Sequence, residues 1–314
     1  MRAAIASFAY RVAGVVLSSE TPLPTLVAVS VGADESLASV TFGMGGPQTG
    51  AADDFELAYD VAVAPGRSEL FMSVSRGAKG YRMRVHGVAD FVVVGACEHI
   101  VCAPLAPLDP EIIEQLLVDQ ILPRALQLRG QPCLHASAVE VRPGRVTALV
   151  GHSGAGKSTL SAALTRRGAP LVCDDCLAVE VQGDVVRVHP GYPSLRLLAD
   201  SAAALEGDDA ELPLATPRTT KRRVRRPASA GPLRLERLVM LQPADVLRPT
   251  LTKLSRSAAV MALTAFVHRL EPRDARLLDG EFRLLTQVAA SVDTFSLVFG
   301  HRFEQLDSVV HLLG

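Results

Sequence analysis

The sequence contains no tryptophan, and only 4% of its 314 residues are aromatic. Aromatic platforms on which nucleic-acid bases stack are therefore scarce. The chain also has no excess of charge of one sign, since 32 Lys and Arg face 33 Asp and Glu and give a formal net charge of -1. A neutral chain argues against binding nucleic acid or an anionic membrane through the whole surface. We expect neither partner.

Long uncharged apolar runs are missing as well. Even the stretch 91–108 contains Glu98 and His99, so it does not predict a membrane-spanning helix of about 18 residues. Near the N-terminus, Arg11 interrupts the apolar stretch that an export signal keeps continuous. The five cysteines are an odd number in a long chain, which is typical of a reducing compartment rather than of a disulfide framework. We expect a cytoplasmic protein.

The length and the 48% of hydrophobic residues predict two globular domains. Short β-type segments separated by Pro65-Gly66 and by the glycines at 77 and 80 predict a mostly antiparallel β domain over residues 1–108. Apolar residues then recur at helical spacing up to Leu128, after a helix start at Asp109-Pro110. We therefore place the domain boundary there, with a second domain over residues 109–314.

The second domain alternates strand and helix patterns. Two strand-like runs, 134–141 and 145–150, are joined by Arg142-Pro143-Gly144 and predict a hairpin. A helix and a strand follow, and then a second hairpin, so the predicted class is α/β with a mixed sheet. The further elements expected are a helix at 157–167, strands at 169–175 and 238–242, a hairpin over 176–190, and helices at 253–270, 280–292 and 303–313.

A glycine-rich segment after the strand 145–150 matches the P-loop pattern, in the strand-to-helix context that this pattern requires. Glycines let backbone N–H groups converge on phosphate oxygens, Lys157 would reach the terminal phosphates, and the Ser158 hydroxyl would bind Mg2+. The sequence therefore predicts a site for a nucleoside triphosphate and Mg2+. The predicted binding residues are Gly151, His152, Ser153, Gly154, Ala155, Gly156, Lys157, Ser158 and Thr159.

Two adjacent carboxylates follow the next predicted strand. Asp174 and Asp175 come 17 and 18 residues after Lys157, a gap long enough for one helix and a return to a neighbouring strand. Adjacent residues of an extended segment point to opposite sides, so one carboxylate can hold Mg2+ while the other approaches an acceptor hydroxyl. This short spacing favours a kinase. An ABC-type ATPase would carry an LSGGQ-like signature, which the sequence lacks.

The core of the second domain resembles the HPr serine kinase/phosphorylase family. The resemblance rests on the strand LHASAVEV, the P-loop and the segment RRGAPLVCDDCLAVE. It implies an HPr kinase-like P-loop fold in which Asp174 is the base for the acceptor serine. It also implies that Asp175 joins Ser158 on Mg2+ and that His135 lies close to the reacting groups. On its own, a lone histidine in an apolar strand is more often a core residue.

The flanking segments resemble a particular branch of that family. Thr159 stands where HPr kinases usually have Glu, whereas the N-terminal run from Tyr10 to Pro24 is similar to the HPr-kinase-like proteins of lasso-peptide biosynthesis. The C-terminal segment 293–309 is similar to theirs as well. This resemblance implies phosphorylation of a side-chain hydroxyl on a precursor peptide.

A basic run lies between prolines at residues 218–226, after an acidic stretch at 206–211, and predicts a charged loop. Lys221 and Arg223 are alternate residues and would share one face of an extended segment. They could then neutralise charge on the transferred phosphoryl group. A solvated charge run without a role is the other interpretation.

We therefore predict an ATP- and Mg2+-dependent kinase whose partner is a peptide or protein bearing a Ser or Thr hydroxyl, with Asp174, His135 and Lys157 as catalytic residues. Three alternatives stay open. One is an HPr kinase/phosphorylase, another is a small-molecule kinase, and the third is a nucleotide-dependent regulatory protein that has no acceptor. The sequence leaves homo-oligomer formation open too.

Overall fold

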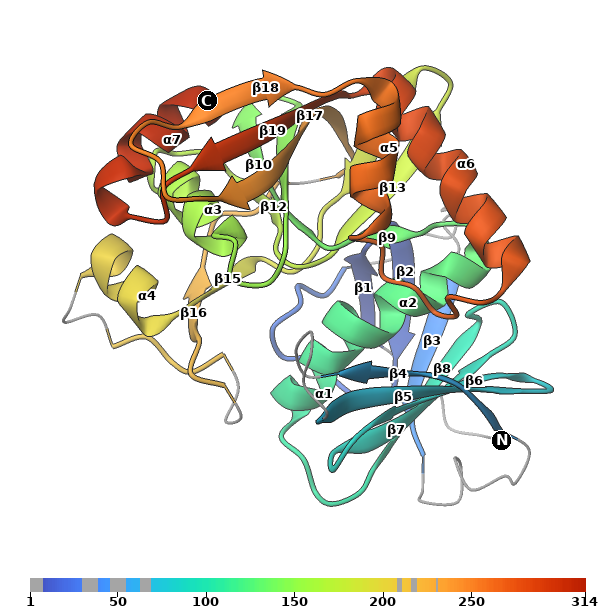
Figure 1. Ribbon diagram of the computed structural model, residues 1–314. Coiled ribbons are helices and arrows are strands. Elements are labelled where there is room, and N and C mark those ends of the chain that lie inside the picture. Colours follow the sequence, from blue (N-terminus) through green and yellow to red (C-terminus); the bar gives the residue numbers. More distant parts are fainter. Residues whose placement is uncertain are drawn as a thin grey trace. The chain divides into compact units, whose positions relative to one another are not determined.

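The computed structural model describes residues 8–29, 39–45, 55–62, 69–207, 211–215, 219–229 and 231–314 (Figure 1). The chain divides into two compact units. Unit 1 comprises residues 1–131 and 269–280, and unit 2 comprises residues 132–268 and 281–314. No helix formed by the described residues combines the length and the apolar character needed to cross a bilayer.

The described part of unit 1 is built on one eight-stranded sheet with the order β1-β2-β3-β8-β7-β6-β5-β4. Neighbouring strands are antiparallel except β3, which runs parallel to both β2 and β8. In β6, Tyr81, Met83 and Val85 are buried and alternate with more exposed residues, as a half-buried strand requires. The strands are β1 Phe8–Val12, β2 Val15–Ser19, β3 Ser39–Met44, β4 Glu56–Ala62, β5 Leu70–Gly77, β6 Gly80–Val85, β7 Ala89–Val94 and β8 His99–Pro104.

A helical segment follows β8 and groups with unit 1. Asp109 caps its start by accepting a hydrogen bond from the Glu111 backbone N–H at 2.9 Å. Arg129, at its end, donates to the backbone oxygens of Ser39 and Ala96. The compact unit therefore ends after residue 131 instead of at the expected boundary after residue 108, because this segment is bonded to the β sheet's own loops. The segment comprises α1 Pro110–Leu116, η2 Leu117–Ile121, α2 Leu122–Ala125 and η3 Leu126–Arg129.

Unit 2 contains a mixed sheet, as the sequence predicted. Its path is β12-β10-β11-β17-β14-β13-β9, and β19 pairs with both β17 and β18. The predicted hairpins are present as the antiparallel pairs β10/β11 and β13/β14. The strands are β9 Cys133–Leu134, β10 Ala136–Arg142, β11 Arg145–Val150, β12 Leu171–Cys173, β13 Leu177–Gln182, β14 Val185–His189, β17 Leu233–Pro243, β18 Thr250–Lys253 and β19 Asp293–Phe299.

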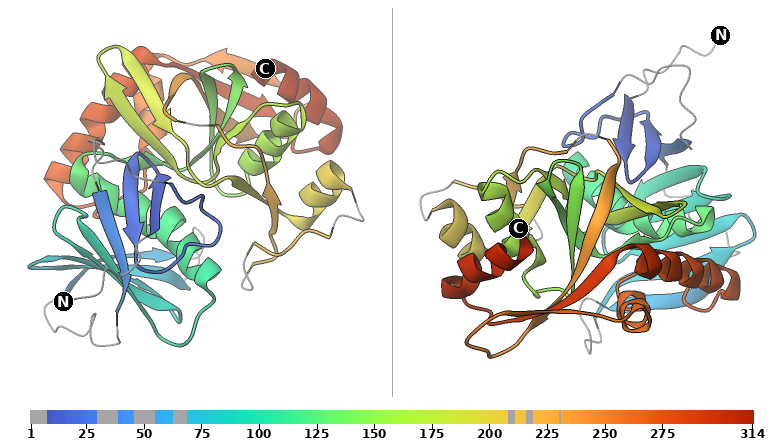
Figure 2. Two further views of the ribbon diagram at one scale, coloured as in Figure 1. Left: turned by 180° about the vertical axis from the view of Figure 1, so that it is seen from behind. Right: turned by 90° about the horizontal axis from the view of Figure 1, so that it is seen from above.

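Helices cover both faces of this sheet (Figures 1 and 2). Val146, Ala148 and Val150 of β11 pack in one core with side chains of α5 and α6, whereas Leu149 packs in a second core with side chains of α3, α4 and α7. Burial on both faces explains why β11 reads as a continuous apolar run. The helices of unit 2 are α3 Lys157–Arg166, α4 Ala199–Glu206, α5 Arg256–Thr264, α7 Leu306–Leu313 and the short η4 Phe303–Gln305, while α6 Ala275–Ser291 begins in unit 1.

The sequence predicted a loop over the basic run, and this prediction is wrong for part of it. Arg222–Arg225 form strand β16, which pairs antiparallel with β15 Ser194–Leu197. The charged side chains concealed this pairing, because alternation of apolar with polar residues is weak in the sequence RRVR. Residues 208–210 of the acidic stretch and Arg218 lie outside the described residues.

Candidate functional site

The topology of unit 2 brings three strand ends to one edge of the sheet. Strand β11 is parallel to β17, and β17 is parallel to β19. Strand β12 is antiparallel to β10, which is antiparallel to β11, so β12 also runs parallel to β11. The P-loop, the aspartate pair and residues 300–303 therefore follow strands whose carboxyl ends share an edge. Ligands of open α/β sheets bind at such an edge.

The P-loop itself depends on glycine at several places. Gly154 and Gly156 have φ of +82° and +94°, in the left-handed region that L-residues rarely adopt. A Cβ on Gly151 would lie 3.1 Å from the Ala155 Cβ and 3.2 Å from the Leu241 Cβ, so this glycine allows close packing against β17. Helix α3 begins directly after Gly156. The unpaired N–H groups of the first turn of α3 therefore face the loop.

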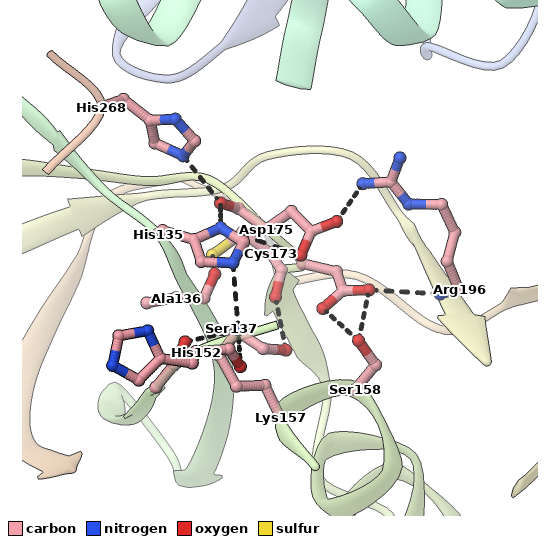
Figure 3. Close-up of polar contacts among 12 residues, drawn as sticks. His135, Ala136, Ser137, His152, Lys157, Ser158, Cys173, Asp175, Arg196 and His268 are labelled. Carbon is pink, nitrogen blue, oxygen red and sulfur yellow. Dashed lines mark hydrogen bonds and ion pairs between the residues drawn. The ribbon is translucent and has the colours of Figure 1, made fainter. Parts of the chain in front are cut away.

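Lys157 is buried and folded back onto the P-loop. Its Nζ donates hydrogen bonds to the backbone oxygens of Gly151 at 2.7 Å and His152 at 3.1 Å. A third contact joins Nζ to His135 Nε2 at 3.0 Å (Figure 3). Burial lowers the pKa of Lys157, although the charges of Asp175 and Asp174 oppose this shift. The three ammonium donors are thus satisfied by acceptors of the protein itself.

Ser158 faces Asp174. The serine Oγ lies 3.0 Å from Oδ1 and 3.1 Å from Oδ2 of this carboxylate. Hard oxygen ligands of this kind suit Mg2+. The family resemblance implied that Asp175 joins Ser158 on Mg2+, whereas the Asp175 carboxylate here pairs with Arg196.

Asp175 is held from several directions. Its φ is +65°, and its carboxylate forms an ion pair with Arg196 of β15. Its backbone oxygen lies 3.1 Å from His135 Nδ1 and 3.1 Å from His268 Nε2 (Figure 3). A carbonyl only accepts hydrogen bonds, so both imidazole nitrogens carry a proton. These contacts explain how a non-glycine residue is kept in a costly conformation.

The proton on His135 Nδ1 fixes the state of the rest of this ring. Burial lowers the pKa of His135, and the charge of Lys157 lowers it further. The neutral ring then has a lone pair on Nε2, and this lone pair accepts the bond from the Lys157 ammonium. His135 thereby links the P-loop lysine to the backbone of Asp175.

The two carboxylates have opposite electrostatic environments. Burial raises the pKa of Asp174, and the neighbouring charge of Asp175 raises it further. Burial would also raise the pKa of Asp175, but the charge of Arg196 and then those of Lys221 and Lys157 hold it well below its ordinary value. Asp175 is thus ionised, and it is the aspartate that lines the pocket described next.

A pocket of about 250 Å³ covers the P-loop. Several of the predicted site residues line it, whereas Gly151, His152, Ala155, Asp174 and Arg223 do not. His152 instead places its ring 4.9 Å from that of Phe266. The predicted residues that line the pocket are His135, Ser153, Gly154, Gly156, Lys157, Ser158, Thr159, Asp175 and Lys221.

The structure separates the two basic residues that were predicted together. Lys221 lines the pocket, and its charge contributes to the low pKa of Asp175. Arg223 is buried and donates to the Ala215 backbone oxygen at 2.7 Å. Lys221 directly precedes β16 and Arg223 is its second residue, and the two side chains have different surroundings.

Sequence reasoning missed three parts of the site. Arg196 pairs with Asp175 and also donates its backbone N–H to Asp174 Oδ2 at 3.1 Å. His268 holds the Asp175 carbonyl. Residues 299–303 line the pocket from the end of β19. The apolar run DTFSLVF before Gly300 was the available signal for β19, whereas nothing in the sequence distinguished Arg196 or His268.

The fold and the site together define a nucleotide-binding P-loop protein of the ATPase or kinase type. The family model described as ABC transporter matches residues 134–199. This span runs from β9 through the P-loop and the aspartate pair to the start of α4. It is well under half of the chain, so it supports a P-loop ATPase-like core without showing membership of the transporter family.

Similarity to solved structures was found as well. The HPr(Ser) kinase/phosphatase from Coxiella burnetii is 14% identical, and the match covers 57% of this chain and 92% of that chain at a TM-score of 0.31. A TM-score of this size is too low to carry an argument about fold or function. No curated protein matches this chain.

Proposed function

We propose that the protein is an ATP- and Mg2+-dependent kinase that transfers the γ-phosphoryl group to a Ser or Thr hydroxyl of a peptide or protein. The observation that carries this proposal is the difference between the surroundings of the two aspartates. Asp174 is buried against Ser158, while Asp175 is ionised and opens into the pocket above the P-loop. A nucleotide switch needs only the first carboxylate. A second carboxylate in the pocket suits an acceptor hydroxyl.

The P-loop residues would bind the nucleotide. Backbone N–H groups at the start of α3 attract phosphate oxygens, and Lys157 would exchange its three protein acceptors for phosphate. Ser158 and Asp174 would hold Mg2+, which neutralises phosphate charge when it is bound. Lys221 and Arg196 add positive charge around the same pocket.

Asp175 would direct the acceptor. The hydroxyl oxygen forms a bond to the γ-phosphorus, the bond from this phosphorus to the β–γ bridging oxygen breaks, and ADP leaves. The hydroxyl proton passes to the Asp175 carboxylate. The low pKa of Asp175 suits an orienting base that accepts the proton late, as expected for a loose transition state.

The acceptor we propose first is a lasso-type precursor peptide, on the basis of the similarity of the N- and C-terminal segments. The test is to incubate the purified protein with γ-labelled ATP, Mg2+, a panel of precursor peptides, HPr and small hydroxy metabolites. Intact-mass analysis should show one added phosphoryl group on a peptide. ATP turnover with no acceptor modified would favour the regulatory alternative, and a modified metabolite would favour a small-molecule kinase.

Matched aspartate variants test the roles. Asp175→Asn should lower transfer about 100-fold or more, while nucleotide affinity changes little, because the general-base contribution is lost. Asp174→Asn should instead raise the Mg2+ concentration needed for half-maximal activity. Both are measured by transfer rates over a Mg2+ titration. If Asp174→Asn fails at saturating Mg2+ while Asp175→Asn keeps wild-type transfer, the roles are those implied by the family resemblance.

A further inference from the structure

The pocket over the P-loop has a side with several apolar residues that the proposed transfer chemistry does not use. In the sheet order, β12 lies on one side of the P-loop strand β11, and β19 lies on the other. The aspartate pair follows β12, whereas residues 300–303 follow β19. The acceptor hydroxyl must approach Asp175, so the β19 side is left for another part of the bound substrates.

Residues of the C-terminal segment form this side. Phe299 and Val309 are buried, whereas Phe303 is 44% exposed although it lines the pocket. His301 joins this wall to the phosphate site, since its Nε2 would lie 3.6 Å from a Cβ placed on Gly156. The wall is therefore continuous with the start of α3, where the phosphates would bind.

We propose that Phe303 and the residues around it form the base subsite of a purine nucleoside triphosphate, with the ring of Phe303 against a face of the base. This inference rests on the proposed function. Three observations select the base as the occupant. The wall has apolar surface from Phe299, Phe303 and Val309 beside the polar His301 and Arg302. It is continuous with the phosphate site, and it follows β19, on the side of β11 away from β12. An aromatic ring and a base also stack without any need for a specific hydrogen bond.

The subsite accounts for an exposed aromatic ring in a chain with few aromatic residues. Covering the ring removes apolar surface from water and restores contact on its open side. The triphosphate would then extend from the β19 side, across the start of α3, to Ser158 and Asp175. The C-terminal segment thereby gains a binding role in addition to its packing against α3.

The test compares two probes and two phenylalanine variants by titration calorimetry with Mg2+ present. ATP reports on both subsites, and inorganic tripolyphosphate reports on the phosphate site alone. Phe303→Ala should weaken ATP binding about tenfold, the effect of losing one stacking contact, and leave tripolyphosphate binding unchanged. Phe282→Ala is the matched control, since Phe282 is 55% exposed on α6 and does not line the pocket. It should change neither affinity.

Photolabelling supports the test independently of any variant. In the wild-type chain, 8-azido-ATP should crosslink to the peptide that contains residues 299–309. Labelling confined to other segments, or ATP affinity within twofold of wild type in Phe303→Ala, would overturn the base subsite and leave the kinase proposal intact. Failure of wild type to bind either ATP or tripolyphosphate would overturn both.

Discussion

Asp175 concentrates the unusual chemistry of the site in one residue. Its backbone is left-handed, its carbonyl takes hydrogen bonds from two histidines, and its carboxylate pairs with Arg196. A non-glycine residue in this conformation costs about 1–2 kcal/mol. The two histidines offset that cost, so we consider them positioning residues that keep the Asp175 carboxylate in the pocket.

Replacement of His268 tests this positioning role. His268→Ala removes one of the two donors to the Asp175 carbonyl and should lower the free energy of unfolding by about 1–3 kcal/mol. Phosphoryl transfer should fall while nucleotide affinity is retained, because His268 does not line the pocket. Thermal melts, transfer rates and calorimetry measure the three effects.

His268→Gln supplies the rescue, because its amide nitrogen can occupy the place of Nε2 and donate to the same carbonyl. It should recover much of the lost transfer rate. His311→Ala, a change at an exposed position of α7, should behave like wild type. Equal transfer rates in His268→Ala and wild type would rule out the positioning role.

The site residues that could be predicted from the sequence are those that belong to a recognisable motif. Lys157, Ser158 and the aspartate pair belong to patterns with fixed spacing. It did not predict which aspartate faces Ser158, since this depends on the φ of Asp175. It also missed His268, which arrives from a segment 93 residues further along the chain and has no local pattern.

At the scale of elements, the junction of β11 and α3 decides the phosphate site. Gly156 takes φ of +94° immediately before the first helical residue. A Cβ there would meet its nearest atom, His301 Nε2, at 3.6 Å, which is ordinary van der Waals contact. Glycine is therefore required at this position by the backbone conformation and not by steric crowding.

Gly156→Ala should lower the free energy of unfolding by about 1 kcal/mol or slightly more through this backbone strain. Nucleotide affinity should fall too, because relaxation of the strain turns the N–H groups at the start of α3. Gly280→Ala is the matched control. Its position in helix α6 is open, so alanine should raise stability by about 1 kcal/mol. Chemical denaturation and calorimetry measure both variants, and an unchanged Gly156→Ala would contradict the expectation.

Helices and strands with a regular pattern of apolar residues were predicted, whereas elements without such a pattern were not. The hairpins β10/β11 and β13/β14 have regular apolar runs and clear turn residues, and both are present. Strand β18 contains only Thr250–Lys253, too short for a period, and it forms by pairing with β19. Helix α5 ends at Thr264 although the apolar pattern continues toward Leu270.

At the scale of the whole molecule, unit 1 is assembled from two separate parts of the chain. Residues 269–280 return to it after most of unit 2. Tyr81 donates to Glu271 at 2.6 Å, and the Leu270 N–H donates to Gln127 Oε1 at 2.9 Å. The boundary after residue 108 was predicted from the change to a helical pattern at Asp109, and no sequence pattern indicates that residues 269–280 return to unit 1.

The extent of unit 1 can be tested with fragments. Leu117, Ile121 and Leu122 of the helical segment are fully buried, and each contributes about 1.5–3 kcal/mol by burial. Residues 1–131 should therefore unfold with a more cooperative and higher thermal transition than residues 1–108, measured by circular dichroism. Identical transitions would mean that the helical segment does not belong to the β unit.

The return of residues 269–280 to unit 1 has a consequence for synthesis on the ribosome. Domains generally fold in the order in which they are translated. The first unit of this chain cannot complete its contacts until Glu271 has left the exit tunnel, by which time nearly all of the P-loop unit has been made. Unit 1 therefore completes its fold only near the end of translation, and it remains incomplete while most of the chain is synthesised.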